Sequence, residues 1–85
     1  MPVVCYFYGI SIFFRFSDHN PPHFHAKYGA YEMSVDIGSW IMKGDFPKKA
    51  EKMVLEWAEQ NEANLLKNWK IAQEHGIVEP IEPLE

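Results

Sequence analysis

The sequence predicts a single α+β domain, in which a small antiparallel sheet of three to four strands has one face covered by a C-terminal helical hairpin. Three observations support this prediction. Residues 1–46 alternate apolar and polar side chains as strands do, residues 47–76 repeat apolar side chains at helical spacing, and residues 77–85 contain two prolines and predict an extended tail. A chain of 85 residues has material for one hydrophobic core, so we expect one domain.

The strand-forming half begins with an aromatic stretch, residues 3–16, in which Gly9 predicts a bulge or bend. Residues 17–22 hold turn-forming side chains and two prolines, which exclude a helix there.

A hairpin is predicted next, with strands at residues 24–28 and 31–37 joined by a two-residue turn at 29–30. Glycine comes first in this turn, which fits type II′ geometry. Residues 38–39 also begin with glycine, so we predict a second two-residue turn there, followed by a short strand at residues 40–43.

The helical half starts at Pro47, which suits the first turn of a helix. Apolar side chains then recur at three- and four-residue spacing, and we assign them to the core: Ala50, Met53, Val54, Trp57, Ala58, Leu65, Leu66, Trp69 and Ala72. Polar residues interrupt this stripe at positions 60–62, which leaves two alternatives. Asn61 caps a second helix, which is the alternative we favour, or one helix runs through with a bend. Gly76 is expected to end it.

Charge and composition narrow the classes of function. The net charge is −4, and residues 50–85 hold eight acidic against three basic side chains, which argues against a broad phosphate-binding surface. The single cysteine, Cys5, excludes an internal disulfide and favours a cytoplasmic location, with the thiol as a buried strand residue. No stretch approaches the ~20 apolar residues that span a membrane.

The dense polar segment of the chain is residues 18–27, where three histidines fall within seven positions. In a strand, His23, His25 and Lys27 share one face, because alternate side chains point the same way. The predicted hairpin sets these three residues opposite partners in the next strand: His23 opposite Asp36, His25 opposite Ser34, and Lys27 opposite Glu32. The apolar side chains then share the other face, so we place the histidines on the face away from the helices.

One interpretation of this segment is a metal site formed by His19, His23 and His25, with Asp18 or Asp36 as a further carboxylate. Neutral imidazoles suit zinc and similar divalent transition ions. Asp36 would bind the ring nitrogen of His23 that does not face the metal and so fix the tautomer of His23.

A second interpretation needs no metal. His23 and His25, oriented by Asp36, would perform acid–base catalysis on an RNA phosphodiester, with binding contacts from Arg15, Asp18 and Lys27. A third interpretation is structural, in which the histidines only bind their cross-strand neighbours. The spacing alone leaves all three open.

The chain also resembles the bacterial domain-of-unknown-function family 4160 over most of its length. The resemblance rests on these residues: Pro2, Phe7–Ile10, Asp18–Ala26, Tyr28–Gly29, Leu55–Ala58, Leu65, Asn68–Trp69 and Ile81–Leu84. It differs at Cys5 and Tyr6, where relatives often have Ser and Arg.

The resemblance implies a component of a toxin–antitoxin-like or regulatory gene pair, with a small protein partner encoded by an adjacent gene. It implies no catalytic residue. A non-catalytic module that docks such a partner is therefore the alternative to an enzyme, and RNA binding and self-association stay open.

Overall fold

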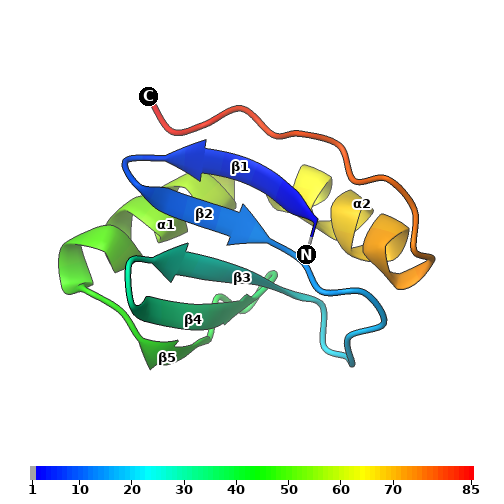
Figure 1. Cartoon of the computed structure of the whole chain (residues 1–85), viewed down its shortest axis with the longest axis horizontal. Coiled ribbons are helices and arrows are strands. Elements are labelled where there is room, and N and C mark those ends of the chain that lie inside the picture. The colour runs from blue at the N-terminus through cyan, green and yellow to red at the C-terminus, as the bar shows by residue number, and fades with distance from the viewer. Residues whose placement is uncertain (1) are drawn as a thin grey trace.

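The computed structural model describes residues 2–85 and has an antiparallel sheet backed by two helices (Figure 1). The elements in chain order are β1 (Val3–Phe7), β2 (Ile10–Phe13), β3 (His23–Tyr28), β4 (Tyr31–Asp36), β5 (Met42–Asp45), α1 (Lys48–Gln60) and α2 (Glu62–Gln73). The five strands lie side by side in sequence order. The predicted α+β class with an antiparallel sheet and C-terminal helices is confirmed.

The sheet has five strands, not three or four, because the aromatic stretch folds back on itself. Tyr8 and Gly9 both have positive φ angles, 49° and 81°, as a two-residue type I′ hairpin turn requires. β1 and β2 therefore pair, with Phe7 opposite Ile10. A tyrosine is an unusual residue for a left-handed position, so the sequence suggested a bend here and not a hairpin.

The central hairpin, β3–β4, has the predicted register. His23 lies opposite Asp36, His25 opposite Ser34, and Tyr28 opposite Tyr31. Gly29 in the turn has a φ of 59°. The positions of the two histidines on the sheet are thus confirmed.

The connection from β4 to β5 is longer than the predicted two-residue turn. It runs from Ile37 to Ile41, and β5 begins two residues later than expected. Trp40 adopts a left-handed φ of 61°, and its backbone N–H donates to the carbonyl of Asp36 at 3.0 Å. Gly44 lies within β5, where a Cβ atom would stand 2.5 Å from the carbonyl oxygen of Glu32, so only glycine fits.

The two helices are distinct, as predicted, but they do not form a hairpin. One residue, Asn61, separates them, which is too short a link to reverse the chain, so α2 continues from α1 toward the other end of the sheet (Figure 1). The expected capping by Asn61 is also wrong. Its side chain makes no cap bond to α2 and donates instead to the carbonyl of Trp57 in α1, at 2.7 Å.

The hydrophobic core lies between the sheet and the helices. Trp57 of α1 is 1% exposed and contacts the rings of Phe7 and Phe24, with centroids 5.5 Å and 6.0 Å away. Trp69 is buried as well, so both tryptophans are core residues, as predicted, and so is Cys5. Burial raises the pKa of the Cys5 thiol, which keeps it protonated and unreactive.

The C-terminal tail covers the edge of the sheet at β1. The backbone N–H of Ile81 donates to the carbonyl of Val4 at 2.8 Å, and the buried amide of Asn68 bonds both backbone groups of Glu79. α2 ends at Gln73, and the left-handed residue that follows is His75, with a φ of 56°, not Gly76. Among residues 2–85, no helix is long and apolar enough to cross a membrane.

Candidate metal centre

Strand β3 positions two buried imidazoles next to each other. His23 and His25 are each 7% exposed, and their ring centroids are 5.1 Å apart. His25 is covered by the ring of Phe13, stacked at 5.3 Å, because Phe13 lies opposite it in β2. His23 lies 5.2 Å from Trp69 at the end of the sheet. The prediction that the histidines lie away from the helices is therefore wrong for His23, since α2 extends past the end of β3.

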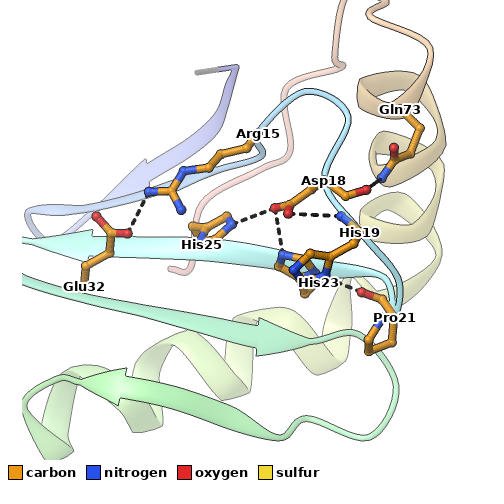
Figure 2. Close-up of polar contacts among 8 residues, drawn as sticks. All are labelled: Arg15, Asp18, His19, Pro21, His23, His25, Glu32 and Gln73. Carbon is orange, nitrogen blue, oxygen red and sulfur yellow. Dashed lines mark hydrogen bonds and ion pairs between the residues drawn. The ribbon is translucent and has the colours of Figure 1, made fainter.

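The third member of the cluster, Asp18, comes from the loop between β2 and β3. A single carboxylate oxygen, Oδ2, lies 2.8 Å from Nε2 of His23 and 3.1 Å from Nε2 of His25 (Figure 2). The other oxygen, Oδ1, accepts the backbone N–H of His19 at 3.1 Å. Both imidazoles thus point at one oxygen.

The loop that presents Asp18 is attached to the C-terminal end of α2. The side-chain amide of Gln73 donates to the backbone carbonyl of Asp18 at 2.6 Å (Figure 2). Nε2 of His75 is 2.6 Å from Oγ of Ser17, and its ring stacks on Phe16 with centroids 5.0 Å apart. These three contacts fix the loop against a helix that is more than 50 residues away in sequence.

The hydrogen bonds of His23 determine which ring nitrogen carries the hydrogen and which one presents a lone pair to Asp18. Nδ1 lies 2.8 Å from the backbone carbonyl of Pro21, which only accepts, so Nδ1 carries the hydrogen and donates. In the neutral imidazole, Nε2 then directs its lone pair at the Asp18 carboxylate. Two acceptors at 2.8 Å repel unless a cation lies between or beside them, so this geometry requires either a proton on Nε2 or a metal ion.

The electrostatic surroundings favour the protonation states that bind metals. Burial lowers the pKa of His25 below its ordinary value, aided by the positive charges of Arg15 and His23 and opposed by the hydrogen bond to Asp18. Burial alone would raise the pKa of Asp18, but the hydrogen bond to His25 and the charge of His23 outweigh it, so the pKa is lowered. A neutral imidazole and a charged carboxylate are the forms that coordinate an ion.

The three side chains are close enough to share one ion. One ligand atom from each of Asp18, His23 and His25 lies within 4.8 Å of the others. Zinc binds nitrogen at about 2.0–2.1 Å and carboxylate oxygen at about 2.0–2.2 Å, so ligand atoms around a tetrahedral ion are about 3.4 Å apart. The two separations from Asp18, 2.8 Å and 3.1 Å, are slightly shorter than this, and the ligand atoms of the two histidines lie within 4.8 Å of each other.

The predicted site residues are only partly brought together. His23, His25 and Asp18 form the cluster, whereas the exposed His19 is outside it, with its ring 5.8 Å from that of His23. Asp36 lies opposite His23, as predicted, but the carboxylate that contacts the imidazole of His23 belongs to Asp18.

The two predicted binding cations lie near the cluster on the same side of the sheet. Arg15 forms an ion pair with Glu32 at 2.9 Å, and the exposed Lys27 lies opposite Glu32 in the register. Gln73 and Phe13 were not predicted to support the site. A helical glutamine and an apolar strand residue give no sequence signal for such a role, because both depend on the folded arrangement of distant elements.

The fold and the cluster together define a small α+β protein with an Asp–His–His group at the end of the β3–β4 hairpin opposite its turn. The chain belongs to the family described as Domain of unknown function (DUF4160), whose model matches residues 9–70 and so includes all three cluster residues. No curated protein and no solved structure was found to match the chain.

Proposed function

We propose that the protein binds one divalent transition ion, zinc or a similar metal, through Asp18 Oδ2, His23 Nε2 and His25 Nε2. The observation that supports this most strongly is the double role of His23. Its Nδ1 is fixed as a donor by the Pro21 carbonyl, so its Nε2 lone pair faces the same point as Asp18 and His25. A ring N–H bound to a backbone carbonyl is the usual outer contact of a metal-binding histidine.

Three protein ligands leave a tetrahedral ion with one free position. Sites of this kind bind water there, lower its pKa to about 7 and use it for hydrolysis. The side chain of Asp18 is 17% exposed, so the cluster is accessible from one side. We therefore propose a toxin-like or regulatory protein that hydrolyses RNA phosphodiesters at this site.

Metal analysis of protein purified without a histidine tag tests the binding proposal. We expect one ion per chain, and we expect Asp18→Asn, His23→Ala and His25→Ala each to weaken binding by more than the 10–100-fold typical of outer contacts. His19→Ala is the matched control and should bind as the wild type does. Equal losses in all four variants, or no ion in the wild type, would overturn the assignment.

The reaction is tested separately, with the metal-loaded protein and a mixed set of RNA oligonucleotides. We expect cleavage that stops on chelation and returns when metal is added. The same three variants should also lose any growth inhibition caused by expression. RNA left intact by a fully loaded protein would exclude the RNA reaction while leaving the metal site in place.

Acid–base catalysis without a metal is a second candidate, supported by the Asp18 oxygen that contacts two imidazoles. A shared carboxylate of this kind can hold one histidine protonated and leave the other free to accept a proton. The two candidates differ in one measurement, because cleavage that survives prolonged chelation would support acid–base catalysis.

Partner docking is a non-catalytic candidate, supported by exposed apolar side chains at the β1 edge of the sheet. Tyr6 and Tyr8 are 68% and 60% exposed. A protein from a neighbouring gene that still binds after the double change His23→Ala and His25→Ala would indicate a docking surface independent of the metal site.

A further inference from the structure

The cationic side chain of Arg15 lies next to the cluster of Asp18, His23 and His25, on the face of the sheet that the helices do not cover. Its guanidinium carbon is 5.6 Å from the centre of the Phe13 ring, and Phe13 in turn stacks on His25. In Figure 2, Arg15 and Glu32 lie to the left of His25, and Asp18 lies to its right. Arg15 is thus connected to His25 through the ring of Phe13.

The charges around the free coordination position do not balance. A divalent ion contributes +2, Asp18 contributes −1, and the ion pair of Arg15 and Glu32 contributes +1 and −1, while both imidazoles are neutral when they bind a metal. The sum at the site is +1. The buried Phe13 ring separates part of this charge from water, which strengthens its attraction for an anion.

The ion pair between Arg15 and Glu32 does not commit the arginine to a structural role. The two side chains are 46% and 40% exposed, and exposed pairs of this kind contribute little to stability. The pair uses one of the terminal nitrogens, Nη2, whereas a guanidinium has five N–H donors. Arg15 can therefore exchange Glu32 for an anion with little loss.

The wider surface favours a single phosphate group over a long polyanion. The register places cations and carboxylates alternately on this face of the sheet, with Lys27 opposite Glu32 and Lys43 opposite Ser34, next to the pair of Glu32 and Asp45. A continuous row of cations, which would add affinity for each further phosphate of a long strand, is absent from this face among residues 2–85, so we expect an RNA to be bound through one phosphate group.

We propose that the free position of the metal takes a phosphate group, whose other oxygens are bound by the guanidinium of Arg15, with Glu32 as the internal competitor for that guanidinium. This inference depends on the proposed metal site and specifies the class of ligand it takes. Arginine suits the role because its planar fork matches two phosphate oxygens at once.

The test uses the full chain loaded with cobalt, whose visible spectrum reports on the ligands of the ion. Inorganic phosphate, a mononucleotide and a short RNA are titrated separately, which distinguishes a free phosphate group from one within a strand. We expect each to change the spectrum, with the short RNA binding no more tightly than the mononucleotide.

Two variants act in opposite directions on this titration. Arg15→Gln should weaken phosphate binding by about 10- to 100-fold, as expected for the loss of charge-assisted hydrogen bonds. Glu32→Gln should strengthen it by about 2- to 5-fold, since it removes a surface competitor. Lys67→Gln is the control, because it breaks an exposed ion pair with Glu79 of similar length, 3.1 Å, outside the site.

The outcomes separate this inference from the proposed function. If cobalt does not bind, both are wrong. If cobalt binds and the phosphate affinity is the same in the wild type, Arg15→Gln and Lys67→Gln, the metal site stands and the phosphate inference is wrong. If no phosphate compound changes the cobalt spectrum, the metal site likewise stands and the phosphate inference is wrong.

Discussion

The hairpin β3–β4 and the loop between β2 and β3 both contribute to the proposed metal centre, but different interactions determine their conformations. The hairpin fixes His23 and His25 through strand pairing between residues close in sequence. The loop fixes Asp18 through contacts with Gln73 and His75, which are 55 and 58 residues further along the chain from their partners. One ligand therefore depends on tertiary contacts that the other two do not need.

This difference means that the fold and the site can be perturbed independently. The hairpin is part of the core, since Phe24 is fully buried against Trp57, so its disruption unfolds the protein. The loop is exposed over much of its length, so weakening it displaces Asp18 while the sheet stays intact. Affinity for the metal should therefore vary among loop variants that have the same global stability.

The same change, phenylalanine to alanine, should have very different effects in the two regions. Phe24→Ala removes a fully buried ring and should lower the free energy of unfolding by about 3–5 kcal/mol. Phe16→Ala removes a 45% exposed ring that stacks on His75 and should cost about 0.5–1.5 kcal/mol. Urea unfolding measures both. Similar losses for the two variants would show that the loop is part of the core.

The sequence was sufficient for the hairpin because its signals are local. Alternation of side chains and a glycine in the turn determine which residues of β3 and β4 face each other, so the cross-strand partners of His23 and His25 were predicted correctly. The β1–β2 turn was not predicted, since Tyr8 adopts a left-handed conformation that tyrosine rarely prefers.

The cluster of Asp18, His23 and His25 was predicted only in part, because the spacing of residues in the sequence does not determine how a loop folds. Asp18 and His19 are neighbours, and the spacing of the histidines predicts His19 as the ligand beside His23 and His25. The bond from Gln73 to the Asp18 carbonyl turns the loop so that Asp18 faces the imidazoles. Asp36 was favoured as the carboxylate because it lies opposite His23, but Asp18 is the residue whose oxygen reaches Nε2.

The contact between α2 and the loop gives the next largest effect. Gln73→Ala removes the hydrogen bond to the Asp18 carbonyl, and we expect metal affinity to fall by about 10- to 100-fold, as for other outer contacts. The free energy of unfolding should change by no more than about 0.5–1.5 kcal/mol, the usual contribution of one hydrogen bond. Competition with a chelator of known affinity measures the first quantity, and urea unfolding the second.

The control for this variant is Gln60→Ala, which makes the same change at an exposed position in the last turn of α1. Metal affinity should stay at the wild-type value. If both glutamine variants bind the metal as the wild type does, the position of Asp18 does not depend on α2, and the contrast between loop and hairpin is lost.

The smallest effect is expected at His75, which is exposed and touches the loop further from the ligands. His75→Ala removes the stack on Phe16 and the bond to Ser17, so the loop should open more often while Gln73 still holds Asp18. The backbone amide of His19, which bonds Asp18 Oδ1, should exchange with deuterium faster. Amides within β3, such as that of Ala26, should keep their wild-type rates, because strand pairing does not involve the loop. The control is Glu74→Ala, one residue earlier, which should leave the exchange rates of both the His19 amide and the β3 amides unchanged. Faster exchange in β3 as well as in the loop of the His75→Ala variant would show that loop and hairpin open as one unit.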